Sequence, residues 1–546
     1  MLLDRYIIYS YNDMSVLLIK FLAKYTGINS YYGNTAGPWY VENNADILTN
    51  KLVELLSSFI SPVVLNNSLI VVAVLLSMLF SYKLFFHLCQ TKSVAVSFSL
   101  FFTFSPYFAS RVISLTQGLY FIFVFPLIFL LLLKKKHPVL IALIASLCML
   151  LSTYYGIFIF LIVVLWYTLE TLTERPFITS AVHKLKYMVV FTATFLLCIA
   201  PWYGQYISKN IPVLRGDYVK PPVSEWMSKS TLIYRPIEDY YSFSLRPWYF
   251  FIPPVNSYLF SDFSQSMYSR IKASGHYLAD DYDKFEMIGT FIPWHLVIFP
   301  ILALGYLMRR KQQVLNKTLI LRLTLVLGVI LFISLPPSIV IRGVTIFTPS
   351  YVVYHVLPIF RVLARWSVVI YLLVLLINVL LLAQIWTTAN KLTRAVLLAM
   401  FLVLTFGLSL LKLPVIDVTK PPAEVAYLES VTREEKVPVL VFPEGDYSFI
   451  FWTLHHKNYL INPANFYDYT NGFNTQENKY RMVNDMQSVL EDHPKAGYLI
   501  VYLNTVDYKD LKKHSTIGTK IDLENYFTEK FGDAVFKTKE VLIYSL

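Results

Sequence analysis

The chain has 546 residues, 56% of them hydrophobic, and its mean hydropathy is +0.53. A water-soluble globular protein is not composed in this way, because its polar side chains could not cover so much apolar surface. The formal net charge is +12, but the surplus of Lys and Arg lies largely in short loops between apolar runs. That distribution indicates orientation in a membrane and excludes a nucleic-acid surface.

Residues 1–66 contain no apolar run long enough to cross a bilayer, which needs roughly 20 residues. Met14–Tyr25 predicts a short amphipathic helix that lies in the membrane interface or packs in a small outer subdomain. We expect 1–66 to be the first extracytoplasmic segment. Such a segment normally follows a span, so we favour a misplaced start that has lost a preceding helix over unaided translocation of the tail.

From residue 67 to 413 the chain is a succession of apolar runs, and we predict about ten transmembrane helices. Because no water is present in the bilayer core to satisfy backbone groups, each run is expected to be helical. The run 138–170 is too long for one span and is expected to turn back as a hairpin at Ser152–Gly156. The predicted spans are 67–88, 93–109, 118–133, 138–152, 154–170, 187–207, 288–308, 318–335, 366–386 and 392–412.

The charges of the connecting loops predict the threading. The short outer loops contain only Arg111, Arg342, Arg361 and Arg365. The positive-inside rule therefore places 1–66, the large loop 208–287 and everything after about 413 outside the cytoplasm. The cations of the predicted inner loops are Lys92, Lys134–Lys136, Arg175, Lys184, Lys186, Arg309, Arg310, Lys311, Lys317, Lys391 and Arg394.

The segment 414–546 changes composition and predicts a small extracytoplasmic α/β domain. Val437–Phe442, Tyr498–Leu503 and Ala534–Tyr544 are rich in β-branched and aromatic residues and predict strands. Gln476–Leu490 and Leu523–Phe531 predict helices. The segment contains no glycine-rich phosphate loop and no nucleophile elbow.

Two acids of the predicted outer surface are candidate catalytic residues. Asp13 directly precedes the amphipathic helix, where it could cap that helix, act as a base, or do both. Glu286 precedes the span near Ile288 and is either a helix-capping acid or a second catalytic acid. The triplet Asp280, Asp281 and Asp283 suits a divalent ion, although such a cluster is usually only solvated. We therefore predict no definite metal site and no certain cofactor, with Mg or Mn left open.

Arg361 and Arg365 are candidates for binding the phosphate of a lipid at the outer mouth of a span. Their spacing of four residues places them on one face of a helix, and two guanidinium groups at headgroup depth can grip a phosphate. The alternatives are that they extend toward lipid headgroups or pair with an acid of an outer loop. The three cysteines lie in or beside apolar runs and predict buried packing.

Several motifs in order resemble the bacterial YfhO-like membrane proteins. They are Phe104-Ser105-Pro106-Tyr107, Pro126-Leu127, Ser152–Gly156, Pro253-Pro254, Glu286–Gly289 and, above all, Pro349-Ser350-Tyr351 followed by Leu357–Trp366. These proteins are in turn similar to the GT-C glycosyltransferases, so the resemblance implies a GT-C-like helical fold. It covers most of residues 10–415. The chain departs from the pattern in lacking a first span and an acid in Ser110–Gln117.

The resemblance implies transfer of a sugar from a polyprenyl-phosphate donor to a glycan, lipid or protein acceptor at the outer face of the cell membrane. In such enzymes an acid of the first outer loop acts as base, and Asp13 matches that position. The expected reaction is inverting. The alternatives are a transporter or flippase of a lipid-linked glycan, which would have charged residues deep within spans, and a non-catalytic membrane protein whose outer domain binds glycan.

Overall fold

The structure of the chain is a computed structural model. It describes residues 2–8, 47–56, 59–173, 177–214, 237–274, 278, 284–356, 362–433, 437–443, 452, 455, 458–460, 481–492 and 494–546. The predicted amphipathic helix and the acidic triplet 280–283 lie outside the described residues.

The described chain contains eight helical segments that are long and apolar enough to cross a membrane. They are Val63–Cys89 of α6 (Pro62–Cys89), α7 (Lys92–Thr103) with α8 (Pro106–Ile113), α11 (Thr153–Thr173), Ala181–Gly204 of α12 (Phe177–Leu214), Ile288–Arg309 of α16 (Lys284–Thr290) and α17 (Trp294–Arg309), α18 (Lys317–Ser334), η3 (Leu363–Trp366) with α20 (Ser367–Thr388), and α21 (Lys391–Ser409). Two shorter apolar segments are η1 (Gln117–Leu119) with α9 (Val124–Leu133), and α10 (Pro138–Leu151). These segments coincide with the ten predicted spans, and the number that cross stays a prediction.

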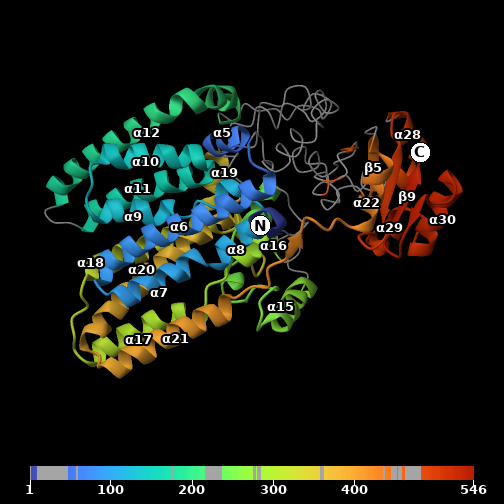
Figure 1. Cartoon of the computed structure of the whole chain (residues 1–546). Coiled ribbons are helices and arrows are strands. Elements are labelled where there is room, and N and C mark those ends of the chain that lie inside the picture. Colours follow the sequence, from blue (N-terminus) through green and yellow to red (C-terminus); the bar gives the residue numbers. More distant parts are fainter. Residues whose placement is uncertain are drawn as a thin grey trace.

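Two of the predicted spans are broken by proline. The span expected at 93–109 divides into α7 and α8, because Pro106 has no N–H to donate and begins a new helix at its N1 position. Ser105 caps α8 by accepting a hydrogen bond from the Phe108 amide at 3.4 Å. Pro293 likewise separates α16 from α17. Both short helices, α8 and α16, lie at the same end of the bundle (Figure 1).

The long apolar run at 138–170 is a helical hairpin, as predicted. α10 ends at Leu151 and α11 begins at Thr153, with Ser152 between them. The two helices pack closely where Gly156 faces Met149, since a Cβ atom added at Gly156 would lie 2.2 Å from the Met149 Cβ. A residue without a side chain is therefore required at position 156.

The bundle is built around α20, whose apolar side chains are buried on every side, as expected of a helix that is hydrophobic all round. The outer helices instead expose apolar side chains, for example Leu197 at 75%, Ile301 at 69% and Val403 at 69%. An apolar outer surface around an apolar core is typical of a bundle that is solvated by lipid.

The connections α6–α7, α9–α10, α17–α18 and α20–α21, which carry most of the predicted inner-loop cations, gather at one end of the bundle (Figure 1). Not all of these cations lie in loops. Lys184 and Lys186 lie within α12, where Lys184 is buried, and Lys391 and Arg394 lie within α21. The side of the membrane that each end faces stays a prediction.

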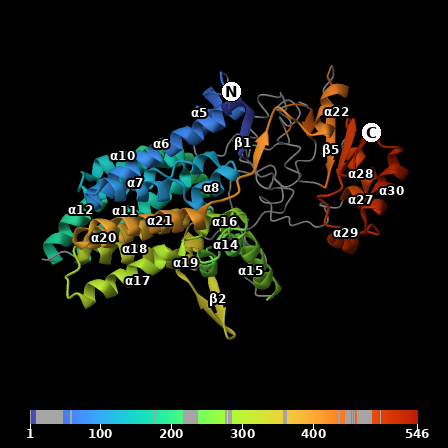
Figure 2. The ribbon, with the colours of Figure 1, turned by 60° about the horizontal axis from the view of Figure 1, so that its bottom comes forward.

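Smaller elements lie at the opposite end, toward the C-terminal region (Figures 1 and 2). These elements are α5 (Ile47–Leu56), α14 (Ile237–Phe243), η2 (Pro247–Phe250), α15 (Ser261–Ala273), β2 (Ser338–Ile341), β3 (Val344–Phe347) and α19 (Pro349–Val356). The strands β2 and β3 form an antiparallel hairpin that was not predicted from the sequence.

The N-terminal residues are tied to the segment that leaves the bundle. β1 (Tyr6–Ile8), preceded by α1 (Leu2–Arg5), pairs antiparallel with β4 (Val415–Asp417). Arg5 donates hydrogen bonds to Asp417 at 2.8 and 3.1 Å, and these bonds hold the pKa of the Asp417 carboxyl below its ordinary value. The Asn67 side chain of α6 donates to the Tyr6 carbonyl at 2.7 Å, which fixes this two-stranded link to the bundle.

The described residues of the C-terminal region form a five-stranded mixed sheet in the order β6-β5-β7-β9-β8. The predicted strands Val437–Phe442 and Tyr498–Leu503 correspond to β5 (Pro438–Phe442) and β7 (Tyr498–Tyr502), which pair in parallel, and β6 (Tyr459–Leu460) joins β5. The single strand expected at Ala534–Tyr544 is instead the pair β8 (Phe536–Lys537) and β9 (Val541–Ser545), because Thr538 accepts hydrogen bonds from the amides of 540 and 541 and turns the chain.

The described residues around the sheet include the helices α22 (Ala423–Val431), α27 (Arg481–Asn484), α28 (Met486–Asp492), α29 (Tyr508–His514) and α30 (Lys520–Phe531). The helix predicted at Gln476–Leu490 corresponds, within its described part, to the two short helices α27 and α28.

Candidate active site

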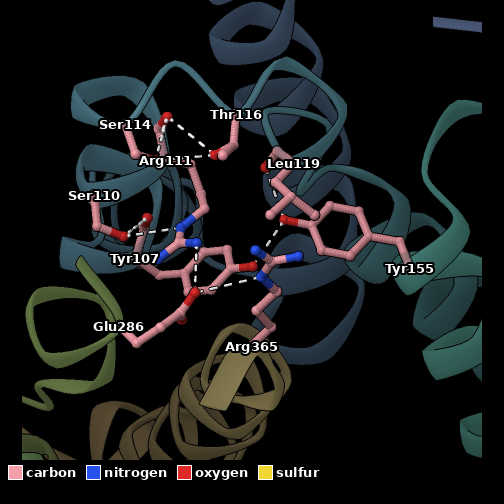
Figure 3. Close-up of polar contacts among 9 residues, drawn as sticks. All are labelled: Tyr107, Ser110, Arg111, Ser114, Thr116, Leu119, Tyr155, Glu286 and Arg365. Carbon is pink, nitrogen blue, oxygen red and sulfur yellow. Dashed lines mark hydrogen bonds and ion pairs between the residues drawn. The ribbon is translucent and has the colours of Figure 1, made fainter. Parts of the chain in front are cut away.

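Two of the four predicted site residues, Glu286 and Arg365, meet in the structure, while Asp13 and Arg361 lie outside the described residues. A third residue joins them. Arg111 was expected in the outer loop Ser110–Gln117, but it belongs to α8 and is buried. Figure 3 shows the three side chains converging from α8, α16 and η3. We call Arg111, Glu286 and Arg365 the Glu286 cluster.

One oxygen of Glu286 accepts from both guanidinium groups. Arg111 Nη1 lies 2.8 Å from Glu286 Oε1, and Arg365 Nε lies 3.3 Å from the same atom. The exposed fractions of the side chains are 2% for Arg111, 4% for Glu286 and 18% for Arg365. The three side chains together carry one net positive charge in a nearly dry environment, where charge interactions are stronger than in water.

The approach of α16 to α8 brings Glu286 within reach of Arg111. It occurs at Gly289, where an added Cβ would lie 3.0 Å from Ser110 Oγ and 3.3 Å from Tyr107 Cδ2. Gly289 is three residues after Glu286 and therefore on the same side of α16. Ser110 Oγ also accepts from Arg111 Nε at 3.1 Å, so Ser110 both lines this contact and orients the guanidinium.

Tyrosines surround the cluster. The Arg365 guanidinium lies over the ring of Tyr154 at 4.4 Å, and that of Arg111 lies over Tyr107 at 5.1 Å. The hydroxyls of Tyr155 and Tyr107 are 3.2 Å apart, and Tyr155 donates to the Leu119 carbonyl at 2.7 Å (Figure 3). The segment Ser152–Gly156 therefore supplies the aromatic contact of Arg365 through Tyr154, and through Tyr155 it bonds to the tyrosine that lies under Arg111.

Glu286 is held ionised by its neighbours. Burial opposes ionisation, but the charges and hydrogen bonds of Arg111 and Arg365 outweigh it, so the pKa of Glu286 lies below its ordinary value. A carboxylate in this state is a poor proton acceptor near neutral pH. It is suited to orienting the two guanidinium groups.

Arg365 retains donors that the cluster does not use. Its hydrogen bond to Glu286 comes from Nε, and neither of its Nη atoms donates to a described residue. Arg365 is also the most exposed member of the cluster. A guanidinium fixed through Nε, with both Nη atoms directed elsewhere, can donate two parallel hydrogen bonds to a phosphate or carboxylate.

A second buried ionic cluster, the Glu170 cluster, comprises Glu170 of α11, Lys184 of α12 and Arg322 of α18. Lys184 Nζ lies 2.6 Å from Glu170 Oε2, and Arg322 Nη1 lies 3.2 Å from Glu170 Oε1. Arg322 Nε also donates to the Thr173 hydroxyl at 2.6 Å. All three charges lie within candidate spans, Thr153–Thr173, Ala181–Gly204 and Lys317–Ser334.

Metal ligands do not gather in the part of the chain that the structure describes, where no three His, Cys, Asp or Glu side chains form a group able to hold an ion. The acidic triplet 280–283 lies outside that part.

No protein-family model matches this chain, and no curated protein sequence matches it. Among solved structures the chain is similar to the arabinofuranosyltransferase AftD from mycobacteria, with 12% sequence identity and a TM-score of 0.44. The match covers 99% of this chain but 38% of that protein, so the chain spans well under half of its length. A TM-score below 0.5 at this sequence identity does not establish a shared fold or activity.

Sequence reasoning missed Arg111, although a signal was present. The residue lies in the apolar run between Pro106 and Leu115, and an arginine within a candidate span is a functional-site hypothesis in its own right. The sequence offered pairing with an outer-loop acid as an alternative for Arg365, and the structure shows that pairing with Glu286.

Proposed function

We propose that this protein is a membrane glycosyltransferase that takes a sugar from a polyprenyl-phosphate donor. The observation that carries the proposal is Arg365, a guanidinium fixed by Glu286 within a cluster of net positive charge, whose Nη atoms donate no hydrogen bond to a described residue. The resemblance of the sequence to GT-C glycosyltransferases points to the same chemistry. The cluster lies where candidate spans end, the depth at which the phosphate of a lipid carrier is found.

In the proposed reaction an acceptor hydroxyl attacks the anomeric carbon of the donor. The new carbon–oxygen bond forms as the bond to the lipid phosphate breaks, and the phosphate leaves with the electron pair. Arg365 donates to the phosphate oxygens and stabilises this charge, which is the role of a preorganised cation. One displacement of this kind inverts the configuration at the anomeric carbon.

The residues around Arg365 have positioning roles in this proposal. Glu286 holds Arg365 in place and remains ionised, so the base must be another group. We assign that role to Asp13, which takes the proton of the acceptor hydroxyl. Arg361 is four residues from Arg365 in the sequence, and we propose it as a second donor to the phosphate.

The remaining assignments are proposals of the same kind. The chain is placed in the plasma membrane as a multi-pass protein, with the Glu286 cluster, the large loop and the C-terminal region on the extracytoplasmic side. The acceptor is a glycan, a lipid or a protein. No metal ion is required by the step as written, and a divalent ion bound by the acidic triplet would add charge stabilisation at the phosphate.

The test is sugar transfer from a radiolabelled polyprenyl-phosphate sugar by full-length protein in membranes. Arg365→Ala is expected to lower the turnover rate by about a hundredfold or more, the usual cost of losing one donor to a developing anion. Asp13→Asn is expected to lower it comparably. Arg270→Gln is the matched control, because it removes one exposed cation from α15 at the same end of the bundle. Full transfer by both Arg365→Ala and Asp13→Asn would refute the assigned roles.

The Glu170 cluster favours a second function, that of a flippase for a lipid-linked glycan, because buried charges within spans commonly line transport paths. Reconstituted vesicles separate the two proposals. A flippase would move a fluorescent polyprenyl-phosphate sugar between leaflets without an acceptor and would lose that activity in Glu170→Gln. The glycosyltransferase would show acceptor-dependent transfer that survives Glu170→Gln.

A further inference from the structure

The hairpin formed by β2 and β3 (338–347) exposes an unusual amount of apolar surface. The exposed fractions are 54% for Ile341, 63% for Val344, 49% for Ile346 and 63% for Phe347. The segment contains no acidic residue, and its single charge is Arg342 at the tip. Exposed apolar side chains of this size, gathered in one small element, mark a contact surface and not an ordinary loop.

The hairpin presents apolar side chains on both of its faces. Cross-strand pairing places Ile339 opposite Ile346 and Ile341 opposite Val344, so these four share one face. Phe347 points to the other face because successive residues of a strand alternate. Its two-residue turn, Arg342-Gly343, has positive φ at both positions and sharply reverses the chain.

The base of the hairpin is fixed to the bundle. Thr348 donates to the carbonyls of Pro336 and Pro337, at 2.5 Å through its hydroxyl and at 3.0 Å through its amide. The hydroxyls of Tyr241 and Ser338 lie 2.6 Å apart, which links β2 to α14. The direction of the hairpin is thus set by the bundle, and Figure 2 shows it projecting sideways from the bundle.

The hairpin continues a surface that already faces lipid. It follows α18, a candidate span that ends at Ser334 and exposes Phe332 at 61%. An element that projects sideways from the end of a span extends roughly along the plane of the membrane. The apolar surface of the hairpin is therefore adjacent to the apolar surface of the spans.

The charge at the tip limits how deeply the hairpin can enter. Arg342 is exposed, and a guanidinium in the hydrocarbon core of a bilayer is costly. At the headgroup level water and phosphate groups are available to it.

We propose that the 338–347 hairpin lies in the interface of the bilayer, with apolar side chains toward the acyl chains and Arg342 among lipid phosphates. The partner is the membrane lipid itself. Arginine at the tip complements anionic headgroups, and Tyr351, whose ring is 4.7 Å from that of Phe347, adds an aromatic residue of the kind found in interfacial belts. This assignment depends on membrane embedding and is independent of sugar transfer.

Site-directed spin labelling tests the proposal in the full chain. A nitroxide is placed at Ile346→Cys in a background without Cys89, Cys148 and Cys198, in vesicles of phosphatidylethanolamine and phosphatidylglycerol. Oxygen collides mainly with labels in lipid, and a soluble nickel complex collides with labels in water. Leu302→Cys on α17, at 65% exposure, is the lipid reference, and Val535→Cys in the C-terminal region, at 45%, is the water reference.

The expected oxygen-to-nickel collision ratio at 346 is several-fold higher than at 535 and approaches the ratio at 302. A ratio equal to that at 535 would overturn the proposal, as would dipolar broadening from a neighbouring label, which would mean that a second copy covers the hairpin. Arg342→Glu is expected to lower the ratio at 346 in the anionic vesicles but not in neutral phosphatidylcholine. An unchanged ratio in the anionic vesicles would contradict the placement of the tip among phosphates.

Discussion

The Glu286 and Glu170 clusters have the same charge composition, one carboxylate and two cations, but they differ in how the cations are held. In the Glu170 cluster each carboxylate oxygen takes one cation, and Arg322 also donates to Thr173. In the Glu286 cluster one oxygen takes both arginines, and the Nη atoms of Arg365 donate to no described residue. Buried charge alone therefore does not identify a binding site, whereas hydrogen-bond donors that remain for a ligand do.

The largest expected effect is on sugar transfer, which should depend on the Glu286 cluster and not on the Glu170 cluster. Glu286→Gln should lower sugar transfer per folded molecule by about a hundredfold, because Arg365 loses the group that positions it. Glu170→Gln is the matched variant and should leave transfer per folded molecule within about twofold of the unchanged protein. The rates are measured on protein that has been quantified as folded by size-exclusion chromatography. Equal losses in the two variants would contradict a special role of the Glu286 cluster in sugar transfer.

Stability should respond alike in the two clusters. Removing either carboxylate leaves two buried cations without their shared counter-ion, which costs about 3–5 kcal/mol in the free energy of unfolding. Thermal unfolding of the full chain in detergent measures this, and both variants should unfold at clearly lower temperatures than the unchanged protein. A Glu170→Gln variant as stable as the unchanged protein would show that the Glu170 cluster is not a structural link among α11, α12 and α18.

A smaller effect tests the close packing of α8 and α16. Gly289→Ala places a Cβ at 3.0 Å from Ser110 Oγ, so α16 must shift by a few tenths of an ångström. We expect a loss of about 1 kcal/mol in stability and a larger relative loss in transfer, since positioning in active sites is sensitive to small displacements. The readout is kcat against KM for the lipid donor. The proposal for Arg365 predicts that both change, and unchanged constants would contradict it.

The smallest effect is a pH dependence. Because the pKa of Glu286 is lowered below its ordinary value of 4.5, the stability that its ionised form contributes is fully present above that value. It is lost only as the pH falls through the lowered pKa of the folded state. Unfolding temperatures should therefore not reveal Glu286 between pH 5 and pH 7. An acid-induced loss below about pH 4 should be reduced in Glu286→Gln.

The sequence predicted the segments of the bundle well, since a long apolar run allows few structures in a membrane. Two of the predicted spans are divided at Pro106 and Pro293, since each proline stands where a new helix begins. The hairpin at 338–347 was missed because its strands are only four residues long.

The candidate site was predicted in part. Glu286 and Arg365 were singled out separately because each lies next to an apolar span. Their meeting with Arg111 could not be read from one sequence, since 175 residues separate Arg111 from Glu286 and 79 separate Glu286 from Arg365. Only the packing of α16 on α8 and η3 brings them together. Asp13 and Arg361 stay predictions.

The most direct test of the central claim is binding of a polyprenyl monophosphate to the full-length protein in lipid nanodiscs. If the Glu286 cluster binds the lipid phosphate, Arg365→Ala should raise the dissociation constant by about tenfold or more, as expected for the loss of a charged hydrogen-bonding pair. Glu170→Gln should leave the constant unchanged. Equal affinity in the unchanged protein and in Arg365→Ala would contradict the claim that this arginine holds the phosphate.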